Sequence, residues 1–248
     1  MLTRILEPEL MDTADDAREY DAMDHSAVNT QFVTDLLDVL TDWSLQRPAK
    51  PGSPLEILDL GAGTAQIPIE LCRRAPHVRV TAVDAAESML AVARTNVAAA
   101  GLGDRIELVL ADAKRFAATG HPATGSAGCR GGGARFGAAS FPVVISNSIV
   151  HHIAEPREVI AEAIRVTAPG GLLFHRDLAR PNDEAQLEIL VDTYAAGASP
   201  HQRKLFADSL RAALTLDEMR TLIAEFGFAP GTVRMTSDRH WTWLATRI

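Results

Sequence analysis

Three short apolar runs, each with the length of a buried strand, end in an aspartate, and this recurrence constrains the fold more than any other feature. Segments with helical spacing of apolar residues lie between the runs. Strands that alternate with helices predict a parallel sheet with helices on both faces. Because the carboxyl ends of parallel strands meet at one edge of a sheet, we expect three carboxylates to lie together there: Asp59, Asp84 and Asp112.

A glycine-rich turn follows the first of these strands. It reads Gly61-Ala62-Gly63-Thr64 and stands directly before a helical pattern. Such turns let backbone N–H groups approach a nucleotide-like ligand. A dinucleotide-binding fold is the rival interpretation, but Gln66 occupies its third glycine position and Asp59 stands where its strand is usually apolar.

The remaining elements are expected from periodicity and from helix start and stop signals. Thr215 and Glu218 have the spacing of a capping box. We expect helices at residues 26–43, 67–75, 87–100, 155–167, 182–196, 200–214 and 215–226, and strands at 55–60, 78–83, 106–111, 141–146, 172–175, 229–235 and 240–247.

The chain is expected to form a single domain over residues 1–248. Residues 1–50 would provide an N-terminal helical cover, and residues 179–214 a helical cap insertion. Residues 117–140 are rich in glycine and poor in large apolar side chains. They predict a mobile loop, since such a segment buries too little surface to offset its ordering entropy.

Composition and charge limit the kinds of binding partner that the chain is expected to have. The net charge is −8, the excess of acid lies in residues 1–42, and there is no clustered basic footprint, so nucleic acid is not expected to bind. No apolar run is long enough to span a bilayer and the start lacks a secretory signal, so we expect a cytoplasmic protein with no membrane partner. Cys72 and Cys129 form no disulfide framework. The oligomeric state stays open, a homodimer included.

Five motifs, taken in order, resemble class I S-adenosylmethionine (SAM)-dependent methyltransferases, in particular the small-molecule branch typified by quinone-biosynthesis enzymes. The resemblance implies a Rossmann-like sheet of seven strands in the order 3-2-1-4-5-7-6, with the last strand antiparallel, helices on both faces and α-helical cap elements. The motifs are Leu58–Thr64, Asp84, Ala111-Asp112-Ala113, Asn147–His152 and Ala168–Gly171.

The resemblance also implies the cofactor SAM, with S-adenosylhomocysteine (SAH) as product, and a set of binding residues. One departure is Ala65, where many members carry glycine. Tyr20 would cover the cofactor, and the backbone of the glycine turn would pack against it. The implied set is Tyr20, Asp59, Gly61, Ala62, Gly63, Asp84, Ala85, Asp112, Ala113 and Asn147.

Individual roles follow from the same resemblance. Asp84 would accept hydrogen bonds from both ribose hydroxyls, a task suited to a carboxylate. Asp112 would accept from the adenine amine, and the Ala113 N–H would meet a ring nitrogen. The Asn147 carbonyl would receive the methionine ammonium. Asp59 would hold the turn, or a water bridging to that ammonium.

The catalytic candidates follow the fourth and fifth strands. His151 and His152 titrate near neutrality and offer a general base, although a histidine here also serves in packing. Arg176 and Arg180 flank Asp177 and suit an acidic substrate group; the alternative is an Arg176–Asp177 pair that fixes the loop. Adjacent histidines lack the i, i+4 spacing of ligands on one helix face, so no metal site is expected.

The predicted function is therefore methyl transfer from SAM to a small-molecule acceptor, with an anionic metabolite as one option. Proximity alone supplies much of the acceleration in such displacements, so a general base is optional. Two alternatives remain open at this point: a non-catalytic SAM- or SAH-binding module, and an NAD-linked oxidoreductase.

Overall fold

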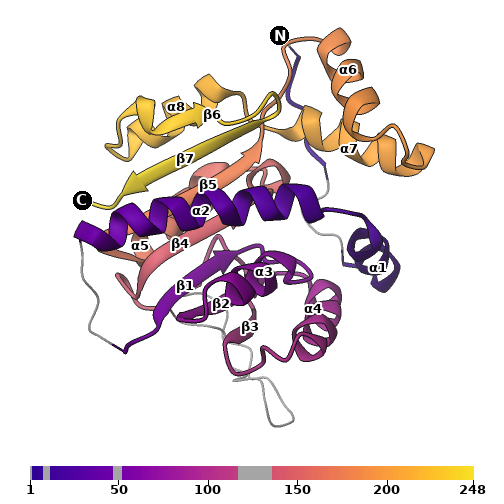
Figure 1. Cartoon of the computed structure of the whole chain (residues 1–248). Coiled ribbons are helices and arrows are strands. Elements are labelled where there is room, and N and C mark those ends of the chain that lie inside the picture. Colours follow the sequence, from indigo (N-terminus) through magenta and orange to yellow (C-terminus); the bar gives the residue numbers. More distant parts are fainter. Residues whose placement is uncertain (1, 8–11, 47–51, 117–135) are drawn as a thin grey trace.

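The computed structural model describes residues 2–7, 12–46, 52–116 and 136–248. Its centre is a sheet of seven strands in the order β3-β2-β1-β4-β5-β7-β6, with β7 antiparallel to both of its neighbours (Figure 1). The predicted order and antiparallel strand are confirmed. The strands are β1 (Leu55–Leu60), β2 (Val78–Asp84), β3 (Ile106–Leu110), β4 (Phe141–Asn147), β5 (Thr167–Leu178), β6 (Val233–Met235) and β7 (His240–Thr246).

The first five strands are parallel, and their register aligns their carboxyl ends. Leu60 pairs with Val83 in β2 and with Ser146 in β4, and Asp84 pairs with Leu110. The glycine turn and the residues that follow β2, β3 and β4 therefore meet at one edge of the sheet.

Helices cover both faces of the sheet, as predicted. α2 (Ser26–Gln46), α3 (Gln66–Arg74) and α4 (Glu87–Ala99) bury apolar side chains against one face, and α5 (Pro156–Val166) and α8 (Leu216–Glu225) against the other. The expected capping box at the start of α8 is present, with the Glu218 N–H donating to Thr215 Oγ1 at 3.2 Å. Trp241 and Trp243 of β7 are fully buried.

Two helices, α6 (Glu184–Tyr194) and α7 (Pro200–Ala212), form the expected insertion above the carboxyl ends of the strands. The extended residues 2–7 run beside them (Figure 1). The Leu2 N–H donates to Asn182 O at 3.0 Å, and the Ile5 N–H donates to Arg211 O at 3.2 Å. These bonds attach the N-terminal segment to the cap.

Three elements differ from the predictions. β6 is shorter than the expected strand 229–235, because Pro230–Thr232 form a 3-10 helix. α1 (Ala14–Ala22) was not expected from its polar sequence; it is capped by Thr13, buries Ala17 and contacts α4. β5 begins five residues before the expected strand and runs through the Pro-Gly-Gly sequence, because Gly170 is held by hydrogen bonds with Arg247 O and Trp43 Nε1. Of the predicted loop 117–140, residues 117–135 lie outside the described residues.

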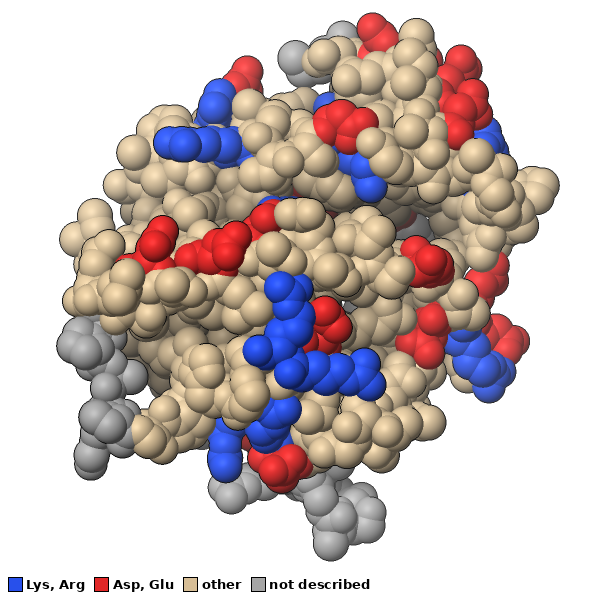
Figure 2. Space-filling view, viewed as in Figure 1, with Lys and Arg blue, Asp and Glu red and all other residues tan. Residues whose placement is uncertain are grey.

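The face viewed in Figure 2 carries both signs of charge. Acidic side chains follow α2, and basic side chains gather beside it over α3. Arg74 of α3 donates to Thr30 O and Thr34 Oγ1 of α2, at 3.3 and 2.9 Å. Among the described helices, none is both long and apolar enough to cross a bilayer.

Candidate active site

The glycine turn is held by the end of β2. The Gly61 and Ala62 N–H groups both donate to Val83 O, at 2.8 and 2.9 Å. Gly61 has φ +72°, and a Cβ there would lie 2.0 Å from Ile149 Cγ2. Glycine is thus required at residue 61 by both conformation and space. Ala65, where relatives often carry glycine, is also left-handed at φ 64°.

Asp84 and Asp112 stand beside this turn. Asp84 accepts from the Gly63 N–H at 2.8 Å and from the Ala86 N–H at 2.9 Å. Burial raises the pKa of Asp84, and these backbone bonds oppose the rise. Asp112 accepts from the Lys114 N–H at 2.8 Å. The two carboxylates predicted to bind ribose and adenine therefore lie at the same edge, and each accepts at least one backbone N–H.

Tyr20 reaches the turn from α1. Its ring would lie 3.8 Å from a Cβ at Gly63, and it packs 4.8 Å from the His25 ring. Burial, with Asp84 and Asp21 nearby, raises the pKa of Tyr20 to about 12. The structure thus places Tyr20 over the glycine turn; its predicted contact with the cofactor stays a prediction.

Asp59 is buried in β1, directly below the turn. Burial first, and then the neighbouring charge of Asp84, raise its pKa to about 7. A buried carboxyl group of this kind holds a proton near neutrality that the unfolded chain releases at about pH 4.

We therefore expect Asp59→Asn to change the pH dependence of stability. Between pH 4 and 7 the folded chain binds more protons than the unfolded chain, so the free energy of unfolding falls as pH rises, by about 2–4 kcal/mol in all. Asparagine cannot ionise, and the variant should gain on the wild type between pH 5 and 8 in urea denaturation. Asp104→Asn, at an exposed aspartate, is the control. The expectation would be contradicted if the difference in free energy of unfolding between Asp59→Asn and the wild type were the same at pH 5 and at pH 8.

Asn147 ends β4 at the same edge. Its Oδ1 is buried and has no hydrogen-bond partner among the described residues. The next residue, Ser148, has φ 59° and donates its N–H to Arg176 O at 2.9 Å. An unpaired buried acceptor is unfavourable unless a ligand or water meets it, which fits the predicted role of residue 147 near the methionine ammonium.

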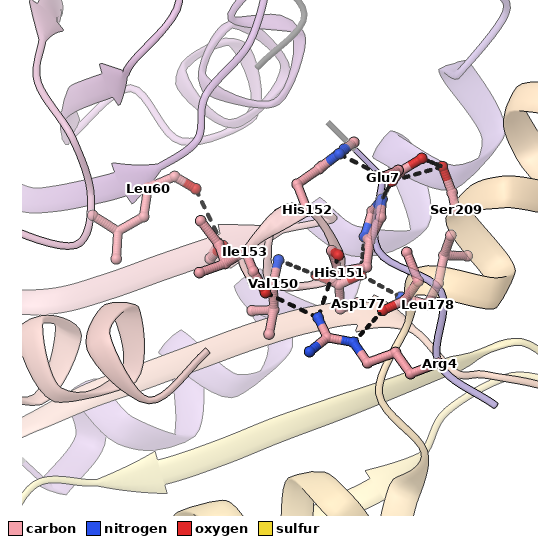
Figure 3. Close-up of polar contacts among 12 residues, drawn as sticks. Arg4, Glu7, Leu60, Val150, His151, His152, Ile153, Asp177, Leu178 and Ser209 are labelled. Atoms are coloured by element: carbon pink, nitrogen blue, oxygen red, sulfur yellow. Dashed lines mark hydrogen bonds and ion pairs between the residues drawn. The ribbon is translucent and has the colours of Figure 1, made fainter. Parts of the chain in front are cut away.

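The two predicted histidines and Asp177 form one cluster (Figure 3). His151 Nδ1 lies 2.5 Å from Asp177 Oδ1. Asp177 also accepts from the N–H groups of Val150 and Leu178, at 2.5 and 2.7 Å. Burial opposes the charge on both side chains, but their mutual contact outweighs it, so the pKa of Asp177 is lowered and that of His151 is raised.

Glu7, which sequence reasoning missed, completes this cluster. Its Oε1 lies 3.0 Å from His152 Nδ1 and 3.5 Å from His151 Nε2, and it accepts from Ser209 Oγ at 3.2 Å. Arg4 attaches the segment by donating to Ile153 O at 2.9 Å and to Ala212 O at 2.7 Å. No motif marks residues 2–7, so their position depends on tertiary contacts alone.

Arg176 lies apart from this cluster. Alternation along β5 puts its side chain on the opposite face from Asp177, where it donates to Asp35 Oδ2 at 2.5 Å and to Thr242 Oγ1 at 2.9 Å. The alternative of an Arg176–Asp177 pair is therefore wrong. Arg176 lines a groove of about 740 Å³ between α2 and the β6–β7 hairpin.

Arg180 is likewise engaged within the fold. It donates to Ala213 O at 2.9 Å and to Glu218 Oε1 at 2.5 Å, and its side chain is buried. These contacts connect the end of β5 with α8 and the cap. An interaction of Arg176 or Arg180 with a substrate stays a prediction.

Comparison with known proteins decides the family. Residues 52–226 match the model of a methyltransferase domain, which is more than half of the chain. The chain belongs to this methyltransferase family. Membership confirms the predicted class, SAM-dependent methyltransferases, and excludes the dinucleotide-binding alternative as the basis of the glycine turn.

Relatives with assigned activities are identical to this chain at about a quarter of the aligned residues. The ubiquinone/menaquinone biosynthesis C-methyltransferase UbiE of Cereibacter sphaeroides is 26% identical over 172 residues, which cover 69% of this chain and 59% of the relative. A ubiquinone biosynthesis O-methyltransferase of Parvibaculum lavamentivorans is 26% identical, covering 73% and 61%. The chain thus spans less than two thirds of either relative.

Solved structures agree on the methyltransferase fold. The plantazolicin methyltransferase BpumL, in complex with a triazolic desmethylPZN analog and SAH, matches with TM-score 0.61 and 15% identity, covering 94% of this chain and 90% of that one. A SAM-dependent methyltransferase from Aquifex aeolicus matches with TM-score 0.58 and 15% identity, covering 95% and 99%. At these identities the likeness concerns the fold.

Proposed function

We propose that this chain transfers a methyl group from SAM to a small-molecule acceptor bound beside His151 and His152. One observation carries the proposal: the glycine turn, Asp84, Asp112 and Asn147 meet at the carboxyl edge of the sheet, next to the histidine cluster. In parallel sheets of this type, ligands bind at that edge.

The arrangement of donors and acceptors supports SAM in particular. SAM offers two ribose hydroxyls, an adenine amine and a methionine ammonium, all of which are donors. The edge presents acceptors in the Asp84 carboxylate, the Asp112 carboxylate and the unpaired Asn147 Oδ1. Tyr20 lies 3.8 Å from the position of a Cβ at Gly63, and from there it would cover the bound cofactor and help to exclude water.

The acceptor side is supported by the cap. Helix α7 contacts residues 150–152, and Glu7 of the N-terminal segment meets both His152 and Ser209 of α7, so these elements would shield an acceptor there from bulk water. The quinone-pathway names of the relatives suggest an acceptor with an aromatic or enolic ring. Such a ring offers either carbon or oxygen as the methyl-accepting atom.

Calorimetric titration of the full chain with SAM, SAH and NADH tests the proposal. We expect SAM and SAH to bind with micromolar affinity and NADH not to bind. Transfer of labelled methyl groups from SAM to a panel of quinone precursors and other phenols should then follow. Tight SAM binding without transfer to any acceptor in cell extracts would favour a non-catalytic SAM-binding module. Binding of NADH alone would overturn the proposed function.

A further inference from the structure

Three potential metal ligands from distant parts of the chain face one another beside the predicted acceptor site. His151 Nε2, His152 Nδ1 and the Glu7 carboxylate lie within 4.8 Å of one another. In Figure 3 both histidines turn toward Glu7, which lies on the N-terminal segment. We propose that Glu7, His151 and His152 bind a divalent transition-metal ion of the Zn²⁺ type.

The spacing of the ligand atoms suits such an ion. Nitrogen and oxygen ligands lie roughly 2.0–2.1 Å from Zn²⁺, so neighbouring ligands of a tetrahedral site are about 3.3 Å apart. Glu7 Oε1 is 3.0 Å from His152 Nδ1 and 3.5 Å from His151 Nε2. The Glu7 oxygen thus already has about this spacing to both nitrogens, and all three atoms lie within 4.8 Å of one another.

A supporting shell of hydrogen bonds is also present. A histidine that binds a metal usually donates its other ring N–H to a carboxylate or carbonyl group, which fixes the tautomer. His151 makes this contact with Asp177, whose oxygens are in turn held by backbone N–H groups. Nδ1 of His151 is thereby committed to Asp177, and Nε2 is the atom that faces Glu7. Ser209 Oγ orients Glu7 in the same way.

The ligand types indicate which ion binds. Two imidazoles and one carboxylate suit Zn²⁺ and related first-row ions such as Co²⁺ and Fe²⁺, whereas Mg²⁺ and Ca²⁺ prefer oxygen ligands. Three protein ligands leave a coordination position open, as in catalytic zinc sites. His152 lies five residues after Asn147, the last residue of β4, so the open position is at the carboxyl edge of the sheet, where the cofactor is expected.

The open position gives the ion a role in methyl transfer. A phenolic or enolic acceptor would bind the ion there through its oxygen, with its proton released to solvent. Attack of the acceptor on the SAM methyl group would then form the new bond to that carbon, break the S–CH3 bond and leave SAH. This role rests on the proposed function, whereas the metal site itself does not. His151 then serves as a ligand rather than as a general base, and Asp177 positions it. Sequence reasoning expected no metal site because it considered the adjacent histidines without Glu7.

Metal binding is tested on the full chain, without an affinity tag, after removal of metal by a chelator. Zn²⁺ titration should show one ion per chain, and Mg²⁺ should not compete. Co²⁺ should give a visible absorption band. Glu7→Gln and His152→Asn should each weaken Zn²⁺ binding by at least about tenfold and remove the band. Exposed His201→Asn, the matched control, should bind as the wild type.

Three results would overturn the metal site: no stoichiometric Zn²⁺ binding, unchanged affinity in both ligand variants, or an equal loss in the His201 control. Circular dichroism checks that each variant is folded. If Glu7→Gln does not fold, the Zn²⁺ affinity of His152→Asn is the test of the site. SAM titration of the same metal-free protein separates the two proposals. SAM binding without Zn²⁺ binding would support the proposed function and contradict the metal site. Zn²⁺ binding without SAM binding would support the metal site and contradict the proposed function.

Discussion

Gly61→Ala is expected to destabilise the protein by about 2–5 kcal/mol, the sum of a left-handed backbone penalty and overpacking. Residue 61 has φ +72°, and the new Cβ would lie 2.0 Å from Ile149 Cγ2. Urea denaturation of the wild type and the variant measures the difference. Because residue 61 opens the predicted cofactor turn, SAM affinity should fall together with stability.

Two further variants separate conformation from crowding at residue 61. Gly101 has nearly the same φ, +68°, but nothing lies within 4 Å of a Cβ there, so Gly101→Ala should show the backbone penalty alone, about 1–2 kcal/mol. Ile149→Ala removes the side-chain atoms that a Cβ at residue 61 would meet. In this background Gly61→Ala should therefore lower the free energy of unfolding by less than it does in the wild type. Equal losses at residues 61 and 101 would show that Ile149 does not restrict the turn.

The sheet was predictable from sequence because local pattern and global order agree. Each strand from β1 to β4 is a short apolar run, and β1 is followed by Gly61, where both conformation and space require glycine. The strand order came from the family resemblance rather than from periodicity. β5 was predicted too short, since the bonds that hold Gly170 in the strand come from residues 43 and 247.

The candidate site was predictable only where it lies on strand ends. Asp84, Asp112 and Asn147 follow strands, and the topology brings them together. Glu7 lies on a segment without helical or strand periodicity and meets His151 only through tertiary docking by Arg4. The pairing of Asp177 with His151 instead of Arg176 depends on which face of β5 each side chain occupies. Because successive side chains of a strand lie on opposite faces, a strand that includes residues 176 and 177 predicts that these two side chains do not pair.

Asp84→Ala should raise the dissociation constant for SAM at least about tenfold, because a hydrogen bond to a charged group contributes about 1.5–3 kcal/mol and two ribose hydroxyls are expected to donate to this carboxylate. Calorimetric titration with SAM and SAH measures the loss. Glu87→Gln, an exposed acid at the start of α4, is the control and should bind as the wild type. Unchanged SAM binding by Asp84→Ala would overturn the ribose assignment.

Asp84→Asn distinguishes ribose binding from support of the turn. Asp84 uses one oxygen for the Gly63 N–H and the other for the Ala86 N–H. The asparagine amide keeps one acceptor oxygen but puts an NH₂ group where the other stood. If the carboxylate only accepted hydrogen bonds from the backbone of the turn, Asp84→Asn and Asp84→Ala would lower SAM affinity and the free energy of unfolding in the same proportion. If it binds ribose, the amide loses one hydroxyl partner, and affinity should fall by more than the change in urea stability accounts for.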